Sequence, residues 1–319
     1  MAQAFEQAVK QLPAEWCGVL QKIPQRQRCG VREITFRVGK AITLTTADGV
    51  CFMERNGNFT PFPPRGNTLT SEEVNRCLRH LTQYSLHAFE TELCGGYLTL
   101  QGGHRCGIAG HAVYKEGALT YVRDVSTVSI RVAREIRGLS QPVLKRLYYG
   151  ERIPSVLILG APGSGKTTLL RDIIRGLADG EAGRYVRVAV VDERGELGAA
   201  RQGTPQYDLG LASDLLDGFY KTDGMLFALR SLAPQVIAVD EIAAESDQSA
   251  VRKVQYGGVS LLASAHASSV EEAYRRDGIG ELLRNGTFDY AVVLEDAKTP
   301  GKVARIEPVI KRKEKSECG

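Results

Sequence analysis

The stretch Gly160-Ala161-Pro162-Gly163-Ser164-Gly165-Lys166-Thr167 matches the phosphate-binding pattern GxxxxGK[ST], the Walker A motif or P-loop. Its glycines allow successive backbone N–H groups to turn toward a phosphate, and Lys166 adds a positive charge for the β- and γ-phosphates. The Thr167 hydroxyl is a ligand for Mg²⁺. We expect this stretch, together with Thr168, to bind ATP; a glycine-rich turn without a ligand is the alternative.

The residues around this motif favour phosphate binding. The apolar run Val156-Leu157-Ile158-Leu159 predicts a buried strand directly before it. Apolar residues at helical spacing then predict a helix whose N-terminus faces the anion: Leu169, Leu170, Ile173, Ile174 and Leu177. A strand, a glycine loop and a helix in this order are the context in which the motif binds nucleotide.

Two further apolar runs end in acidic residues. Val236-Ile237-Ala238-Val239 is followed by Asp240 and Glu241, and the run 186–191 is followed by Asp192-Glu193-Arg194-Gly195-Glu196. Carboxylates at strand ends lie at the crevice where α/β proteins bind ligands. We expect Asp240 to hold Mg²⁺ and Glu241 to orient or deprotonate the attacking water. Solvated strand ends are the alternative, which the P-loop makes less favoured.

A third apolar run, Leu261-Leu262-Ala263-Ser264-Ala265, ends at His266. If this run is a strand of the same sheet, the imidazole lies at the same edge as the P-loop. It can then hydrogen-bond to the γ-phosphate. A purely structural role for His266 stays open from the sequence alone.

The second part of the chain, residues 153–310, is predicted to be a doubly wound α/β domain. Nearly continuous aliphatic runs are typical of parallel strands buried on both faces, and the runs at 259–263 and 291–294 complete the set. The segments between the runs are long enough for the helical crossovers that parallel strands require.

The first part, residues 1–135, is predicted to be a smaller α+β domain. Alternation at 33–39 and 41–45 indicates a hairpin, and short strands are expected at 97–100, 105–109, 118–122 and 128–132. Helices are expected at the N-terminus and from Ser71, with Thr70 or Ser71 as the cap. A linker helix within 136–152 joins the domains, and residues 311–319 form a basic tail.

The seven cysteines are expected to be reduced thiols, because no pair has CxxC spacing. Zinc ligation by Cys94, His104, Cys106 and His111 is an alternative. Their spacing fits no common zinc module, and the glycine pairs beside them favour turns between short strands.

The composition is that of an ordinary globular protein of about two domains at ~150 residues each. The chain has 319 residues, 43% of them apolar, and a net charge of +4, too small by itself to imply a nucleic-acid partner. Its N-terminus lacks a signal-peptide core, and no apolar run is long enough to span a membrane. We therefore expect a cytoplasmic protein without direct membrane insertion.

Several ordered motifs together resemble the stage III sporulation protein AA family, which is related to the ATPases of type II and type IV secretion and pilus systems. The resemblance covers most of the chain, and these stretches carry it: 33–39, 96–105, 165–172, 191–196, 221–225, 230–235 and 240–242. It implies a RecA/AAA+-like ATPase domain.

The resemblance also implies roles for individual residues. The stretch Asp192 to Glu196 is similar to the acidic box of secretion ATPases, and Ser264-Ala265-His266 to their histidine box. Glu193 shares the catalytic assignment with Glu241, which we favour for its place beside Asp240. Family members work as rings, hexamers above all, with an arginine supplied across the subunit interface. The candidates for that arginine are Arg37, Arg105, Arg123, Arg131 and Arg230.

One position departs from the family pattern, because Ala212 stands where a basic residue is usual. A phosphate or inter-subunit contact there is in doubt. The resemblance further implies a mother-cell ATPase held at the membrane through proteins of a channel complex that joins mother cell and forespore.

Two other functions remain open from the sequence. A nucleic-acid motor shares this sheet and P-loop, and the basic stretch 311–315 is its best support, but no aromatic platform for stacking bases accompanies it. A scaffold that binds ATP to order a ring, with negligible hydrolysis, is the second.

Overall fold

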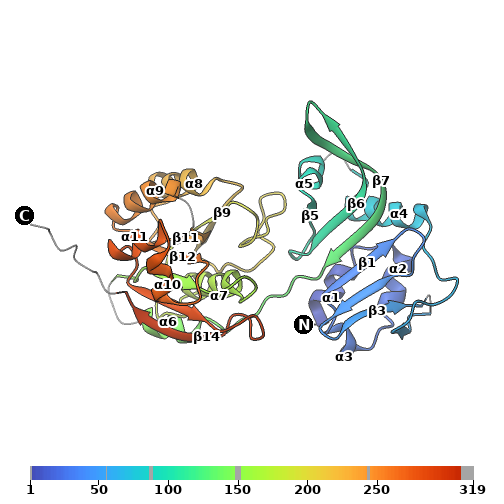
Figure 1. Ribbon diagram of the computed structural model, residues 1–319, viewed down its shortest axis with the longest axis horizontal. Coiled ribbons are helices and arrows are strands. Elements are labelled where there is room, and N and C mark those ends of the chain that lie inside the picture. The colour runs from blue at the N-terminus through green and yellow to red at the C-terminus, as the bar shows by residue number, and fades with distance from the viewer. Residues whose placement is uncertain (1, 55, 86–88, 148–151, 243–244, 310–319) are drawn as a thin grey trace, which may run out of the picture. The chain divides into compact units, whose positions relative to one another are not determined.

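A computed structural model describes residues 2–54, 56–85, 89–147, 152–242 and 245–309. The chain divides into two compact units, Met1–Arg134 and Glu135–Gly319, and each contains a seven-stranded sheet (Figure 1). The basic tail expected at 311–319, and the end of the expected linker helix at 148–151, lie outside the described residues.

The first unit is a sheet of antiparallel pairs in the order β4-β3-β2-β1-β7-β6-β5. Its strands are β1 (Glu33–Arg37), β2 (Thr43–Thr46), β3 (Gly49–Met53), β4 (Phe59–Thr60), β5 (Tyr97–Thr99), β6 (Arg105–Lys115) and β7 (Ala118–Arg131). Its helices are α1 (Ala2–Val9), α2 (Ala14–Leu20), α3 (Gln25–Arg28), α4 (Ser71–Leu81) and α5 (Glu90–Cys94).

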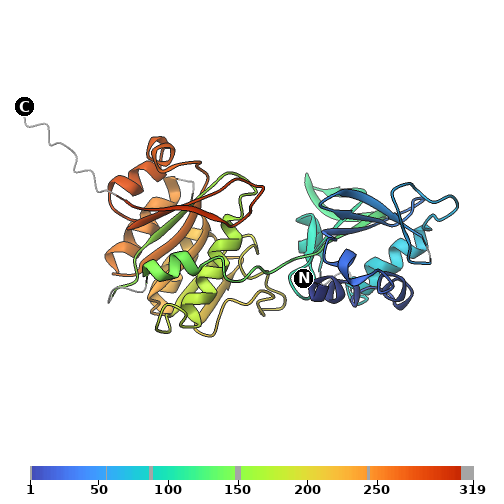
Figure 2. The same ribbon diagram turned by 90° about the horizontal axis from the view of Figure 1, so that it is seen from below.

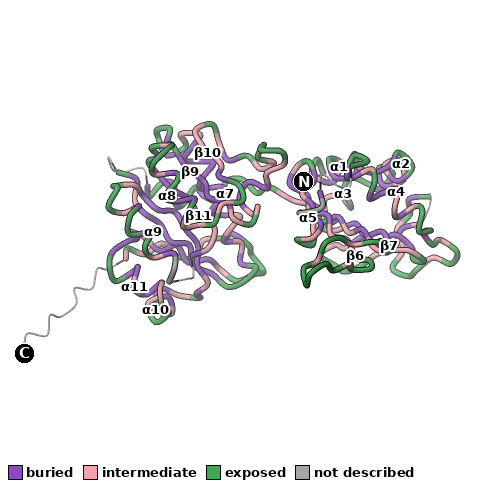
Figure 3. The backbone as a smooth tube through the Cα atoms, turned by 90° about the horizontal axis from the view of Figure 1, so that it is seen from above, coloured by how far each residue is buried: buried purple, intermediate pink, exposed green. Residues whose placement is uncertain are grey.

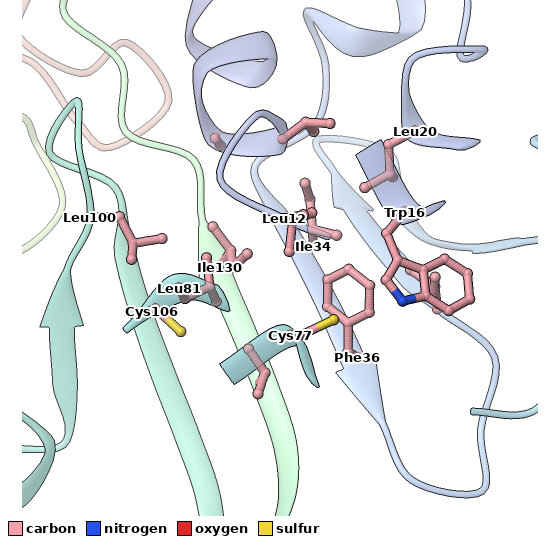
Figure 4. Packing of buried hydrophobic residues seen from close by; sticks show 14 of the residues in the cluster. Leu12, Trp16, Leu20, Ile34, Phe36, Cys77, Leu81, Leu100, Cys106 and Ile130 are labelled. Atoms are coloured by element: carbon pink, nitrogen blue, oxygen red, sulfur yellow. The ribbon is translucent and has the colours of Figure 1, made fainter. Parts of the chain in front are cut away.

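The core of the first unit lies between one face of this sheet and the helices. Ile34 and Phe36 alternate along β1 and are fully buried, as the alternating sequence predicts. Trp16 of α2 packs edge-on against Phe36, with ring centroids 6.1 Å apart (Figure 4). Cys77 and Leu81 of α4 belong to the same buried cluster.

Helix α4 begins at Ser71 because Thr70 caps it. The Thr70 hydroxyl accepts the Glu73 N–H at 3.2 Å, and the Glu73 carboxylate accepts the Thr70 N–H at 2.7 Å. This reciprocal capping box satisfies two backbone donors that the first turn leaves without helical partners.

Strands β6 and β7 form one long hairpin, although the sequence analysis expected separate strands at 118–122 and 128–132. β7 is continuous over Ala118–Arg131 and pairs with β6. The register shifts between Ala109 and His111, where Gly110 lies so close to the backbone of Arg123 that a Cβ would collide with it. A β-bulge at this point lets the pairing with β6 continue past the shift in register. One continuous strand, β7, therefore replaces the two strands that were predicted.

Cys94, His104, Cys106 and His111 lie in separate surroundings. Cys106 is buried in the core, the Cys94 thiol donates to the Thr120 carbonyl at 2.9 Å, and His111 is exposed. Within the described ranges, no group of three or more His, Cys, Asp or Glu side chains is placed to hold a metal ion. Burial raises the pKa of the Cys106 thiol to about 12, as expected of an inert core cysteine.

His104 is fully buried next to Ala133, near the C-terminal end of the first unit. Its Nδ1 accepts the Ala133 N–H at 3.0 Å, and its Nε2 has no hydrogen-bond partner among the described residues. Burial without a partner for a second proton lowers the pKa of the imidazole to about 4.

The second unit is a mostly parallel sheet in the order β10-β9-β11-β12-β8-β13-β14. Its strands are β8 (Val156–Leu159), β9 (Val188–Asp192), β10 (Ser213–Asp217), β11 (Val236–Glu241), β12 (Ser260–Ala265), β13 (Tyr290–Leu294) and β14 (Val303–Pro308). Its helices are α6 (Gln141–Leu147), α7 (Lys166–Ala178), α8 (Lys221–Ser231), α9 (Glu245–Tyr256), α10 (Val270–Arg275) and α11 (Ile279–Arg284).

Helices cover both faces of this second sheet, with a separate core on each (Figure 2). Leu157 and Ile237 pack with α8, α9, α10 and α11, while Ile158 and Ala238 pack with α6 and α7. Figure 3 shows the central strands as a buried layer between exposed helix surfaces. Burial on both faces explains why these strands have continuous apolar sequences.

The sheet has two edge strands that the sequence analysis did not predict. β10 pairs with β9 in parallel, whereas β14 pairs with β13 antiparallel. Both edge strands are mostly exposed or half-buried. They lack the continuous apolar run that identifies a central strand, which explains why they were missed.

Among the described residues, no helix combines the length and the hydropathy needed to cross a bilayer.

The buried His104 predicts that the first unit loses stability in mild acid. The unfolded chain takes up a proton near pH 6.5, whereas the folded imidazole resists protonation down to about pH 4. The free energy of unfolding should therefore fall by about 3 kcal/mol across this window. Trp16 is the chain's single tryptophan, so urea unfolding followed by its fluorescence reports on this unit.

The matched control is His104→Asn, which keeps an acceptor for the Ala133 N–H but cannot titrate. The difference in the free energy of unfolding between wild type and variant should change with pH between 6.5 and 4. Parallel stability curves for the two proteins would contradict the assignment.

Candidate functional site

The carboxyl ends of β8, β9, β11 and β12 meet at one edge of the second sheet, and a cavity of about 550 Å³ opens there. The P-loop, the segment after β9, the ends of β11 and β12 and the start of α8 form its walls. The predicted site residues that line it are Pro162, Gly163, Gly165, Lys166, Thr167, Glu193, Asp240, Glu241 and His266.

The P-loop conformation depends on close backbone approaches. Gly165 has φ +89°, and a Cβ there would collide with the backbone of Pro300 and Gly301. The Gly301 N–H donates to the Ser164 carbonyl at 2.7 Å, so the turn between β13 and β14 supports the loop. A Cβ at Gly160 would collide with the Ser164 hydroxyl. These two glycines are thus needed for packing as well as for phosphate access.

Lys166, the first residue of α7, is buried at the floor of the loop. Its ammonium group donates to the carbonyls of Gly160 at 3.0 Å and Ala161 at 3.3 Å, and lies 2.9 Å from Nδ1 of His266. Burial lowers the pKa of Lys166, while the carboxylates of Glu241 and Asp240 act in the opposite direction.

His266 joins the P-loop lysine to a strand-end acid. Its Nδ1 faces the Lys166 ammonium and therefore acts as an acceptor, and its Nε2 lies 3.3 Å from Oε1 of Glu241. The sequence placed His266 and Glu241 at this edge separately. Only the structure shows that the His266 ring contacts both Lys166 and Glu241.

Thr167 and Asp240 provide oxygen ligands of the kind that Mg²⁺ prefers. The Thr167 hydroxyl donates to Oδ1 of Asp240 at 3.1 Å. Burial raises the pKa of the Asp240 carboxyl well above its ordinary value, and a hydrogen bond to the Glu196 side chain together with the negative charge of Glu196 raises it further. Two carboxyls held together next to a hydroxyl form a donor set that fits a hard divalent cation.

Glu196 is a site residue that the sequence analysis did not assign. The stretch Asp192 to Glu196 was assigned by its resemblance to the acidic box of secretion ATPases, and within it only Glu193 was given a catalytic role. The carboxylate of Asp192, at the end of β9, accepts the backbone N–H groups of Glu196 at 2.8 Å, Leu197 at 3.1 Å and Gly198 at 2.7 Å. This tight turn brings Glu196 back toward Asp240. The sequence signal for this role was the three-residue spacing between Glu193 and Glu196, which is the spacing of a helical turn.

Unlike Glu196, which turns toward Asp240, Glu193 forms an ion pair with a lysine. Lys221, the first residue of α8, has its ammonium nitrogen 3.7 Å from Oε2 of Glu193 and 4.0 Å from Oδ2 of Asp247. The same ammonium donates to the backbone carbonyl of Glu241 at 2.6 Å. Lys221, which was not among the predicted site residues, thus connects both candidate catalytic glutamates.

Some predicted residues lie elsewhere. Thr168 lines a separate small cavity with Arg171 and Asp208, and the Ser164 side chain is fully buried within the loop. Ala212 is half-buried against the core that includes α7, and its N–H donates to the Ala178 carbonyl at 3.2 Å.

Of the candidate interface arginines, four belong to the first unit and Arg230 lies on α8, where its Nε donates to the Leu226 carbonyl at 3.1 Å. The four are Arg37, Arg105, Arg123 and Arg131.

Solved structures of an ATPase and of a pilus retraction motor have a similar fold. The ATPase DotB of Legionella pneumophila superposes with a TM-score of 0.55 at 17% identity, covering 86% of this chain and 74% of that one. The pilus retraction motor PilT with bound ADP gives a TM-score of 0.55 at 13% identity, covering 83% of this chain and 74% of that one. The predicted fold, an α/β P-loop ATPase domain after a smaller α+β domain, is confirmed.

Sequence comparison identifies the family. Stage III sporulation protein AA of Bacillus subtilis (strain 168) is 33% identical over 296 residues, which are 92% of this chain and 92% of that protein. Residues 6–313 match the model of the family described as "Sporulation stage III, protein AA". The resemblance inferred from the motifs is confirmed, and the chain belongs to the stage III sporulation protein AA family.

Proposed function

We propose that the chain is a Mg²⁺-dependent ATP hydrolase of the secretion-ATPase type. One observation carries the proposal: Lys166 and Thr167 of the P-loop helix face Asp240 and Glu241 of β11 across a single cavity. This arrangement combines phosphate-binding, cation-binding and proton-accepting groups at the edge of the sheet where α/β proteins bind ligands.

In this proposal the P-loop backbone and Lys166 bind the β- and γ-phosphates of ATP. The ammonium group of Lys166 now donates to two carbonyls and lies against His266. Phosphate oxygens are stronger acceptors than neutral carbonyls, so they attract this buried charge. Nδ1 of His266 is then released from Lys166, and the ring can keep its Nε2 on Glu241 or turn it to the γ-phosphate.

Thr167 and Asp240 would hold Mg²⁺, with Glu196 beside them. When bound, the cation neutralises charge that develops on the phosphates. The Asp240 and Glu196 carboxyls are already held together, which is costly without a positive charge between them. Binding of a divalent cation therefore relieves a repulsion that the fold imposes.

Glu241 is the residue that we propose as general base. It lies at the end of β11, and its carboxylate is 3.3 Å from the His266 ring, which orients it toward the P-loop side of the cavity. The Glu193 carboxylate is instead engaged by the Lys221 ammonium group at 3.7 Å, so it is less available to an attacking water. The geometry thus favours Glu241 over Glu193.

We further propose that the protein works as a ring, a hexamer above all, with an arginine of one subunit completing the site of the next. Its family and its fold, which is that of DotB and PilT, support this proposal. The ring would energise assembly or transport by a membrane channel complex between mother cell and forespore. It would be held at the cytoplasmic face of the membrane by proteins of that complex.

Replacing Lys166 by alanine should weaken nucleotide binding by about ten- to a hundredfold, because a charge-assisted contact to phosphate is lost. Fluorescence titration with N-methylanthraniloyl-ATP measures the affinity. Lys145→Ala, an exposed lysine of α6, is the control and should bind as the wild type does. Equal affinity in a folded Lys166→Ala protein would contradict the P-loop assignment.

Replacing Glu241 by glutamine should lower kcat by at least about a hundredfold and leave nucleotide affinity nearly unchanged, because the substitution removes the basicity of the side chain and keeps its shape. Phosphate release under saturating ATP measures kcat. Glu193→Gln is the matched comparison and should lower kcat less. If Glu193→Gln abolished hydrolysis while Glu241→Gln did not, Glu193 would be the base.

A further inference from the structure

Arg171 links the P-loop helix to the acidic turn after β9. It lies on α7, four residues after Thr167 and thus on the same side of the helix. Its Nη2 donates to the Glu196 carbonyl at 2.7 Å, and its Nε donates to the Leu197 carbonyl at 3.0 Å. One guanidinium group therefore holds two consecutive backbone carbonyls of the turn.

The same two residues are held from the opposite side. The Asp192 carboxylate accepts the N–H groups of Glu196 and Leu197 at 2.8 and 3.1 Å, while Arg171 binds their carbonyls. The backbone N–H and C=O of both Glu196 and Leu197 are therefore occupied, which holds in place the backbone from which the Glu196 side chain projects. That side chain lines the large cavity together with Thr167 and Asp240.

The plane of the guanidinium group is also fixed. The Arg171 carbon Cζ lies 3.7 Å from the centroid of the Tyr207 ring, a cation–π contact. Asp208, the next residue, donates its N–H to the Glu135 carboxylate at 2.7 Å, and its own carboxylate lies 2.8 Å from Nη2 of Arg137. Tyr207 is thus a supported platform under Arg171.

We propose that Arg171 is a positioning residue that holds Glu196 at the cation site of Thr167 and Asp240. This inference rests on the proposed function and adds a contributor to it. Arg171 itself lies outside the residues that line the large cavity. Arg171 acts through the backbone of residues 196–197. It should therefore change the affinity for the divalent cation and leave the affinity for the nucleotide unchanged.

The geometry requires arginine at this position. A guanidinium group presents parallel N–H donors and a flat face, whereas a lysine ammonium is a point charge that cannot bridge two carbonyls and stack at once. Arg171→Lys should therefore restore only part of the function lost in Arg171→Met.

The test is a MgCl₂ titration of N-methylanthraniloyl-ADP binding to the full chain. In Arg171→Met the Mg²⁺ concentration at half-saturation should rise at least tenfold, with an intermediate rise, of at least threefold, in Arg171→Lys. Nucleotide affinity in excess EDTA should match the wild type in both. Arg175→Lys is the matched control: Arg175 is one turn further along α7 and pairs with Asp172 and Glu181, away from the acidic turn, so its substitution should leave the half-saturation unchanged.

Hydrogen exchange, measured without nucleotide, separates this inference from the function on which it rests. Arg171→Met should accelerate exchange in the peptide covering residues 193–198, and Arg175→Lys should not. A folded Arg171→Met protein with a half-saturation within twofold of the wild type would overturn the inference. If Arg171→Met does not fold, an unchanged half-saturation in Arg171→Lys overturns it. Wild-type protein that binds no nucleotide in Mg²⁺ would contradict the proposed function itself.

Discussion

The parallel register of β8, β12, β11 and β9 brings the carboxyl ends of four strands to one edge of the sheet. The segments that follow β8, β9 and β12 carry the P-loop, the acidic turn and His266, while Asp240 and Glu241 end β11 itself. The site therefore depends on strand pairing far more than on any single contact, and a slip in one pair would displace a complete set of ligands.

The second constraint is charge. Asp240 and Glu241 lie close to the buried Lys166. Burial lowers the pKa of Lys166 and raises the pKa of Asp240, so it favours the uncharged form of each group. Such a cluster is poorly balanced by itself. A triphosphate would bring negative charge to Lys166, and a divalent cation would bring positive charge to Asp240. Bound together, they would compensate both groups.

Local sequence predicted the parts of the fold that have strong local signals. The P-loop with β8 before it and α7 after it follows from the sequence, because the glycine pattern and the apolar periodicity are short-range. Strands β10 and β14 were missed because edge strands lack a continuous apolar run, and the bulge at Gly110 joins two predicted strands into one. The role of Glu196 was missed because it depends on a turn closed by Asp192 and Arg171, and these contacts connect different elements.

The proposed ATPase activity is tested most directly by phosphate release from ATP by the purified chain, measured with Mg²⁺ and with excess EDTA over a range of protein concentrations. We expect phosphate release that requires Mg²⁺, with a specific activity that rises as subunits assemble. An absence of Mg²⁺-dependent release at every concentration would contradict it. The chain would then bind nucleotide without turning it over.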